Sequence, residues 1–203
     1  MAQLFFPSEV LTIGVDEAGR GPLAGPVVAA AVILGANPPL GLDDSKKLSA
    51  KRRAALEPEI QRTCRWALGL ASVQEIDEIN IFAATMLAMT RAVAALTHQH
   101  DCANFEVLID GNMTPAGRTE GWRWPARAIV GGDALEPCIS AASIVAKEHR
   151  DHLMRAAAVQ HPHYGWERNM GYGTSEHMAA LRLHGATPLH RRSFAPVRQL
   201  VLM

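Results

Sequence analysis

The most informative part of the sequence is the stretch Ile13-Gly14-Val15-Asp16-Glu17-Ala18-Gly19-Arg20-Gly21-Pro22. The apolar run that leads into it predicts a buried strand over Val10–Asp16, followed by a glycine-rich turn. Adjacent carboxylates at the end of a strand repel each other and lose hydration, and a bound cation offsets that cost. The glycines let backbone N–H groups approach a ligand closely. We therefore expect a cation beside Asp16 and Glu17; the alternative is a solvent-facing turn.

Length and composition describe an ordinary globular protein. The 203 residues suit one sizeable domain, and the chain is 48% hydrophobic and 20% charged. The longest uncharged apolar stretch, residues 22–40, is interrupted by glycine and proline and so predicts no membrane span. The N-terminus lacks the basic region of a signal peptide. Cys64, Cys102 and Cys138 are odd in number and widely spaced, which argues against a disulfide framework and favours a reducing compartment, the cytoplasm.

Charge is distributed unevenly although the formal net charge is zero. Residues 147–198 hold eight Lys or Arg and four Asp or Glu, whereas residues 1–146 hold twelve Lys or Arg and sixteen Asp or Glu. An acidic centre beside a basic flank is typical of a metal-dependent enzyme that acts on a phosphate polymer. A solvated surface with uneven charge explains the same counts.

The hydrophobic pattern predicts one mixed sheet flanked by helices, an α/β fold, with a helical C-terminal appendage. The predicted strands are Val10–Asp16, Val27–Leu34, Cys64–Val73, Phe105–Ile109 and Ala126–Val130. The predicted helices begin at the cap Ser49, at the capping box 72–75, at Asn80, at about Leu135 and at Thr174 or Ser175. We expect Pro58 to kink or end the first of them near Glu57, and the others to end near Leu96, Gln160 and Gly185.

Two more carboxylates stand beside glycines after apolar strands. Asp110 closes the strand before Gly111, and Asp133 follows two glycines and precedes a helix. Alone, each has an ordinary interpretation, a turn for Asp110 and a helix N-cap for Asp133. Because ligands gather at strand ends in open sheets, the recurrence predicts that the four carboxylates converge. Their charge matches two divalent cations, and an all-oxygen shell suits Mg²⁺ or Mn²⁺.

Basic, hydroxyl and aromatic side chains elsewhere allow two interpretations each. Ser143 and Lys147 are four residues apart and so share one helix face. Lys46, Lys47, Lys147 and Arg150 are either surface charges or phosphate contacts. Tyr172, between two glycines, either stacks on a base or sugar or plugs its loop against the core.

Taken together, these segments resemble the bacterial type 2 ribonucleases H, the ribonuclease HII family. The resemblance covers nearly the whole chain, and its first segment is highly specific. The matching segments are residues 14–27 and 44–48, Asp110-Gly111, Gly132-Asp133, residues 140–147, Gly171-Tyr172 and residues 190–194.

The resemblance implies a ribonuclease H-like catalytic core over residues 1–160 and a basic C-terminal segment, residues 161–203, packed on it. It implies an endonuclease that cuts the phosphodiester 5′ of a ribonucleotide in RNA–DNA hybrids and in duplex DNA with single ribonucleotides. The products carry 3′-hydroxyl and 5′-phosphate ends. The enzyme would be a cytoplasmic monomer that binds no membrane, without the extra N-terminal domain of the type 3 enzymes.

The same resemblance implies roles for individual residues. Two divalent cations, Mn²⁺ or Mg²⁺, would be bound by the catalytic carboxylates Asp16, Glu17, Asp110 and Asp133, one to activate water and one to stabilise the leaving oxygen. The turn Gly19-Arg20-Gly21 would read the 2′-hydroxyl, and Tyr172 would pack on the adjoining deoxyribose. The candidates for phosphate contacts are Lys46, Ser143 and Lys147.

Two departures and two competing functions accompany this assignment. Gly132 stands where the family commonly has lysine, and Gly173 where it commonly has proline, which removes a phosphate contact and loosens the loop of Tyr172. A DNA junction nuclease on the same fold is one alternative, although it has no use for a 2′-hydroxyl reader. A non-catalytic hybrid-binding module is the other, and it would lack one of the carboxylates.

Overall fold

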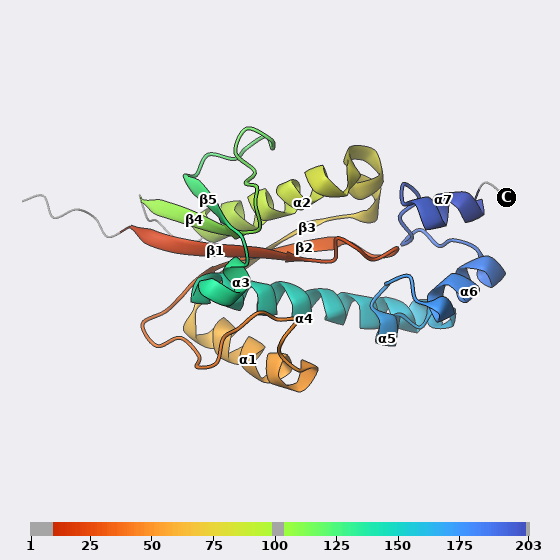
Figure 1. Cartoon of the computed structure of the whole chain (residues 1–203), viewed down its shortest axis with the longest axis horizontal. Helices are drawn as coiled ribbons and strands as arrows, with labels where there is room; N and C mark the ends of the chain where they lie inside the picture. The colour runs from red at the N-terminus through yellow and green to blue at the C-terminus, as the bar shows by residue number, and fades with distance from the viewer. Residues whose placement is uncertain (1–9, 99–103, 202–203) are drawn as a thin grey trace, which may run out of the picture.

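The computed structural model describes residues 10–98 and 104–201, which form a five-stranded sheet with helices on both faces (Figure 1). The strands are β1 (Leu11–Ala18), β2 (Val27–Ile33), β3 (Arg65–Ala71), β4 (Phe105–Asp110) and β5 (Ala126–Ile129), in the order β3-β2-β1-β4-β5. β2 pairs antiparallel with β1 and β3, whereas β4 runs parallel to β1 and β5. The predicted mixed sheet is confirmed. The parallel pairing of β1 with β4 brings the carboxyl ends of both strands to one edge.

The helices cover the two faces of the sheet unequally (Figure 1). α2 (Val73–His98) lies on one face, and α1 (Ala50–Thr63) and α4 (Pro137–Gln160) lie on the other. β2 is buried along its whole length, as expected of an apolar strand covered on both faces.

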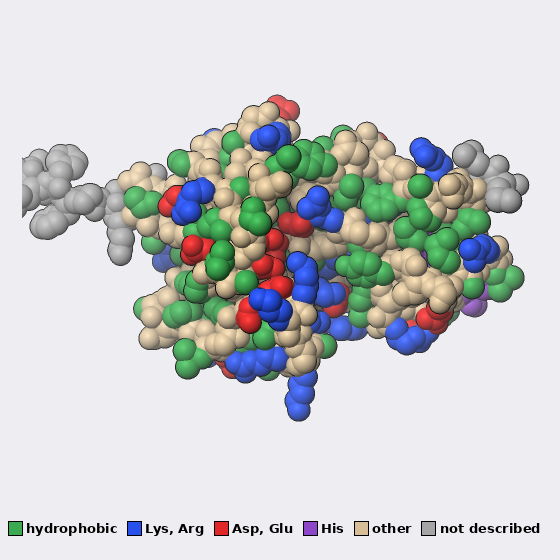
Figure 2. Space-filling model, in the orientation of Figure 1, with side chains coloured by type: hydrophobic (Ala, Val, Ile, Leu, Met, Phe, Trp, Pro, Cys, Tyr) green, Lys and Arg blue, Asp and Glu red, His purple; other side chains and the backbone are tan. Residues whose placement is uncertain are grey.

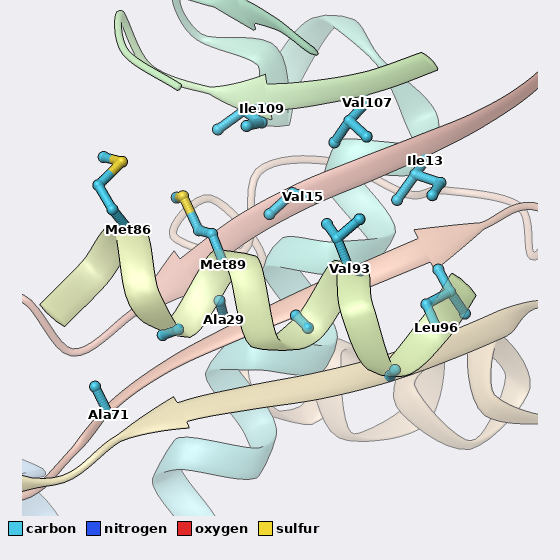
Figure 3. Close-up of a cluster of buried hydrophobic side chains, with 14 of the residues drawn as sticks. Ile13, Val15, Ala29, Ala71, Met86, Met89, Val93, Leu96, Val107 and Ile109 are labelled. Carbon is cyan, nitrogen blue, oxygen red and sulfur yellow. The ribbon is translucent and has the colours of Figure 1, made fainter. Parts of the chain in front are cut away.

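The larger core lies between the sheet and α2 (Figure 3). Ile13, Val15, Val107 and Ile109 point from β1 and β4 toward Met89 and its neighbours on α2. α2 is long and apolar enough to cross a membrane by length and composition, but half of its most apolar window is buried in this core. We interpret it as the central helix of the fold.

A second core joins the opposite sheet face to α1 and α4, with Ala30, Leu56 and Ile144 among its buried residues. Gly14 allows the close approach of α4, because a Cβ atom there would lie 2.2 Å from the carbonyl carbon of Cys138. The start of α4 is therefore held directly against β1.

The C-terminal segment packs on the far end of α4 (Figure 1). It contains the short helices η1 (Pro162–Tyr164) and α5 (Trp166–Asn169), then α6 (Ser175–His184) and α7 (Ala195–Val201). Its buried side chains Tyr164 and Trp166 contact a cluster that includes Leu23 and Met154. An isolated bridge between Ala24 and His190 joins it to the turn after β1.

Predicted helix starts are confirmed where a side chain caps the backbone. Ser49 accepts a hydrogen bond from the Arg52 amide at 3.2 Å, and Thr174 accepts one from His177 at 3.3 Å. Asn80 has a φ of 66° inside α2, and its side chain accepts from the two amides that begin the second part of that helix. The two predicted helices are thus joined across this kink.

Three predicted boundaries were wrong. β1 runs on to Ala18, so Asp16 and Glu17 lie within the strand, opposite Ala30 and Ala29 of β2. α1 continues through Pro58 to Thr63, because buried Leu56 and Ile60 hold it against α4 on both sides of the proline. The helix expected from Leu135 is two helices, α3 (Gly132–Leu135) and α4, separated by Glu136.

Candidate active site

Three carboxylates from three elements meet at the edge of the sheet. Asp16 lies in β1, Asp110 ends β4, and Asp133 lies in the first turn of α3. One carboxylate oxygen of each lies within 4.8 Å of the others, a spacing that could hold a metal ion. The convergence predicted for these three residues is therefore present in the structure.

Glu17 lies beside this cluster and not within it. Neighbouring strand residues point to opposite faces, and its carboxylate lies 3.3 Å from the guanidinium of Arg20. Glu17 lines the same cavity as Asp16 and Asp110. Burial raises the pKa of Glu17, the Arg20 guanidinium partly opposes this shift, and the charge of Asp110 adds to it.

Asp133 does not cap a helix, so the N-cap alternative is wrong. The residue before α3 is Gly131, which makes no side-chain cap hydrogen bond, and Asp133 lies inside the helix. Its amide donates to the Asp110 carboxylate at 3.3 Å. A Cβ atom on Gly132 would lie 2.6 Å from Ile139, so a longer residue there requires Ile139 to move.

The cluster is electrostatically costly without a cation. Burial, then the charges of Glu17 and Asp110, raise the pKa of Asp16 well above its ordinary value, and the Ser143 hydroxyl partly opposes this shift. Burial, then Asp110, also raises the pKa of Asp133. Burial lowers the pKa of Lys46, but the carboxylates Asp16 and Asp133 outweigh that effect and raise it.

The loop of residues 44–48 extends a cation over the carboxylates. The Lys46 ammonium lies 3.6 Å from Asp133 Oδ2 while its side chain is 76% exposed, so a substrate can reach it. Ser143 is buried on α4 and donates to Ser45 Oγ at 2.8 Å, which ties this loop to the helix. A phosphate contact by Ser143 remains a prediction.

Lys147 lines the same cavity but is already paired. Its ammonium donates to Asp151 Oδ1 at 2.6 Å, and its side chain is 24% exposed. Lys47 pairs with Asp43 at 3.6 Å on the exposed side of its loop. The structure does not test whether Lys47 or Lys147 contacts phosphate.

The glycine turn and Tyr172 line the same cavity as Asp16 and Asp110, with a volume of about 190 Å³. Tyr172 is 47% exposed, so the alternative that it plugs the core is wrong. A Cβ atom on Gly21 would lie 3.6 Å from the Tyr172 ring, so the turn and this ring face one space. The other residues that line the cavity are Asp16, Glu17, Ala18, Gly19, Arg20, Ser45, Lys46, Asp110, Lys147 and Arg150.

Two buried arginines lie behind the turn, a place the sequence did not predict. Arg150, expected at the surface or on phosphate, is buried and donates to the carbonyls of Ala24, Pro26 and Met170 at 3.0–3.1 Å. Arg191 is fully buried, and the only sequence signal for it was its place in the matching segment 190–194.

On the space-filling surface, acidic side chains gather at the middle of one face with lysines and arginines beside them (Figure 2).

Comparisons with known proteins agree with this geometry. The sequence model of the family described as Ribonuclease HII matches residues 13–197. A ribonuclease HII of Novosphingobium aromaticivorans is 72% identical over 196 residues, covering 96% of this chain and all of the relative. One of Sphingopyxis alaskensis is 65% identical over 193 residues, covering 95% of this chain and 93% of the relative.

Solved structures share the fold at low sequence identity. The ribonuclease H2 of Pyrococcus horikoshii OT3 has a TM-score of 0.73 at 23% identity and covers 93% of this chain and 96% of its own. Bst-RNase HIII in complex with Mn²⁺ has a TM-score of 0.74 at 19% identity, covering 95% of this chain and 70% of its own. From the family match and the close relatives, the chain belongs to the ribonuclease HII family, whose members are metal-dependent ribonuclease H endonucleases acting on RNA–DNA substrates.

Proposed function

We propose that this enzyme cuts the phosphodiester on the 5′ side of a ribonucleotide, in RNA–DNA hybrids and in duplex DNA that contains one ribonucleotide. The products carry 3′-hydroxyl and 5′-phosphate ends. The observation that carries the proposal is one cavity lined both by Asp16 and Asp110 and by the Gly19–Gly21 turn with Tyr172. A phosphate held at the carboxylates then places the neighbouring sugars against the turn.

Divalent cations fit the residues at the carboxylate end. Asp16, Asp110 and Asp133 offer hard oxygen ligands within 4.8 Å of one another, and Glu17 lies beside them. The raised pKa values of Asp16 and Asp133 reflect charge that a cation would neutralise. We propose two ions, Mg²⁺ or Mn²⁺, and note that the structure of Bst-RNase HIII contains Mn²⁺. When bound, such ions activate water and stabilise the leaving 3′-oxygen.

The chain's own residues orient the substrate. Lys46 is exposed above Asp133 and is suited to hold the phosphate next to the cut, with Lys147 and Ser143 as further candidates. The turn Gly19-Arg20-Gly21 offers backbone groups to the 2′-hydroxyl, the group that separates ribose from deoxyribose. Tyr172 offers a half-exposed ring to the sugar that follows. Two neighbouring nucleotides are thereby tested, first for the presence of the hydroxyl and then for its absence.

Cleavage of matched duplexes tests the proposal. The substrates are duplex DNA with a single ribonucleotide, the same duplex of DNA alone, and an RNA–DNA hybrid, with the cut mapped to the nucleotide. We expect cleavage 5′ of the single ribonucleotide and none of the all-DNA duplex. Cutting of all-DNA branched junctions would favour the junction nuclease instead, and tight binding of the hybrid without cleavage would favour the binding module.

We further propose that the enzyme acts as a cytoplasmic monomer with a catalytic core over residues 1–160 and an appended segment over residues 161–203. The free, buried thiols of Cys64 and Cys138 suit a reducing compartment. The contacts of Arg191 with the turn after β1 support a C-terminal segment that completes the site.

A further inference from the structure

Arg191 is bound to the backbone of the turn that faces the substrate cavity. Its guanidinium donates to the carbonyl of Gly19 at 2.5 Å and to that of Arg20 at 2.9 Å. It also donates to the carbonyls of Gly25 and Pro26 at 2.9 and 3.2 Å. All four acceptors are backbone oxygens between β1 and β2, and Arg191 is the side chain that binds the carbonyls of Gly19 and Arg20 there, while Arg150 binds those of Ala24 and Pro26.

The orientation of these carbonyls determines the orientation of the amides next to them. A trans peptide unit is planar, and its C=O and N–H point in opposite directions; the described residues contain no cis peptide. Because the Gly19 and Arg20 carbonyls point inward to Arg191, the amides of Arg20 and Gly21 point outward. Residues 19–21 line the cavity, so outward is toward the substrate. Within residues 10–98 and 104–201, neither amide donates a hydrogen bond.

Burying a charged guanidinium costs free energy, which is a large cost for a side chain that only holds two segments together. Arg191 is fully buried, and no carboxylate among the described residues forms an ion pair with it. Burial, then the neighbouring Arg150, lowers the pKa of Arg191 to about 9, so it stays charged at neutral pH. Its backbone is held in place by the Leu23 carbonyl, which accepts from the Arg191 amide at 2.8 Å.

We propose that Arg191 is the positioning residue for 2′-hydroxyl recognition: by holding the carbonyls of Gly19 and Arg20, it aims the amides of Arg20 and Gly21 at the ribose. This inference rests on the proposed function of the turn. It places a specificity determinant in the C-terminal segment, behind the turn and out of contact with the substrate. The planar fork of arginine matters, because the ammonium of lysine cannot hold two successive carbonyls in one plane.

The test compares Arg191→Lys with wild-type enzyme on two duplexes. One carries a single ribonucleotide, and the other carries a 2′-deoxy-2′-fluoro nucleotide there, which keeps a ribose-like sugar pucker but has no hydroxyl. Single-turnover rates are measured at saturating substrate. We expect Arg191→Lys to lower the rate on the ribonucleotide by about tenfold, as for the loss of one or two hydrogen bonds. The rate on the fluoro duplex should change by less than about twofold.

Arg150→Lys is the matched control. Arg150 is equally buried and donates to three carbonyls, but to neither Gly19 nor Arg20. We expect a comparable drop in melting temperature, with the rates on both duplexes changing by the same factor. An equal change of both rates in Arg191→Lys would overturn the proposal, and so would a change of their ratio in Arg150→Lys as large as in Arg191→Lys.

Amide NMR of the wild-type protein covers the case in which Arg191→Lys does not fold. We expect the Arg20 and Gly21 amide signals to shift on addition of the ribonucleotide duplex and not of the fluoro duplex. Equal shifts with both duplexes, or none, would contradict the proposal. If the wild-type enzyme itself cuts both duplexes equally, the proposed reading of the 2′-hydroxyl fails. If it discriminates and Arg191→Lys discriminates as well, only the role of Arg191 fails.

Discussion

Asp16 carries the largest electrostatic cost in the candidate site. It is 3% exposed, and its own strand places Glu17 next to it while β4 brings Asp110. A metal-free protein must keep this carboxyl protonated or bear the repulsion, whereas a divalent cation removes both costs. The residue therefore opposes stability in the absence of metal and serves the reaction in its presence.

The variant Asp16→Asn should separate the effect of Asp16 on cleavage from its effect on stability. Loss of a metal ligand should lower the cleavage rate by about three orders of magnitude. With chelator present, the free energy of unfolding at pH 7 should rise by roughly 1 kcal/mol, because a buried charge is removed with little change of volume. Cleavage assays and chemical denaturation measure the two. Glu59→Gln, an exposed carboxyl on α1, should change neither; normal cleavage by Asp16→Asn would exclude it as a ligand.

Tyr172 should matter most where a deoxyribose follows the ribonucleotide. Its exposed ring stands opposite Gly21, so Tyr172→Ala should lower cleavage of a single-ribonucleotide duplex by about tenfold or more. A long RNA–DNA hybrid, in which ribose follows most ribonucleotides, should lose much less. Tyr172→Phe keeps the ring and is the control. An equal loss on both substrates would contradict the assignment.

At the scale of elements, α1 holds the loop that carries Lys46. Arg53 donates to the Glu148 carboxylate on α4 at 2.8 Å and to the carbonyls of Ser45 and Leu48 at 2.9 and 2.8 Å. The side chains of Arg53 and Glu148 are 11% and 3% exposed, so water cannot replace either partner. The position of Lys46 over the carboxylates thus depends on how α1 packs against α4.

Arg53→Met should destabilise the fold by about 3 kcal/mol, because Glu148 is left buried and unpaired. Urea denaturation measures this loss, and the double variant with Glu148→Met should recover part of it. Arg52→Met is the control, since Arg52 is exposed and loses only one hydrogen bond, to Leu40 at 2.8 Å. If the unfolding free energies lost in the two single variants sum to the loss in the double variant, the two residues are not coupled.

At the scale of the whole molecule, buried histidines hold the C-terminal segment together. Trp166 donates to His177 Nε2 at 3.1 Å, which leaves His177 Nδ1 to donate to the Tyr172 carbonyl at 2.9 Å. His190 Nε2 then donates to His177 at 3.0 Å, and its Nδ1 accepts from the Thr187 amide. Every ring nitrogen is satisfied only while both rings are neutral, and the network ends at the loop of Tyr172.

This network predicts a loss of stability in acid. Burial, then His177, lowers the pKa of His190 to about 4, below its ordinary value of 6.5. The unfolded state therefore binds more protons between these values, so the contribution of His190 is complete above pH 6.5 and is lost as the pH falls toward 4.

The difference in unfolding free energy between the wild-type protein and His190→Gln isolates this contribution, since other titrating groups cancel. It should shrink by about 2 to 3 kcal/mol from pH 7 to pH 4. Denaturation at a series of pH values measures it. A difference independent of pH would mean that the pKa of His190 is the same in the folded and the unfolded protein.

The sequence by itself predicted what depends on neighbours along the chain. Strand and helix segments follow from hydrophobic period, and the predicted helix starts at Ser49, at Asn80 and at Thr174 or Ser175 lie where a side chain accepts a hydrogen bond from a nearby amide. The resemblance of ordered motifs predicted the family and the hydrophobic pattern predicted a mixed sheet, both confirmed. The recurrence of carboxylates after strands predicted the meeting of Asp16, Asp110 and Asp133, whereas Glu17, also expected there, lies beside them.

Only the tertiary structure decided what depends on contacts between distant segments. Packing against α4 carried α1 past Pro58, and pairing with β2 carried β1 past Asp16. Arg150 was expected at the surface or on phosphate, yet folding buried it. Folding also buried Arg191, which the sequence marked only by its place in the segment 190–194, and brought it to the carbonyls of Gly19, Arg20, Gly25 and Pro26. A guanidinium can be buried when backbone oxygens accept its protons, and those oxygens come together only once the chain is folded.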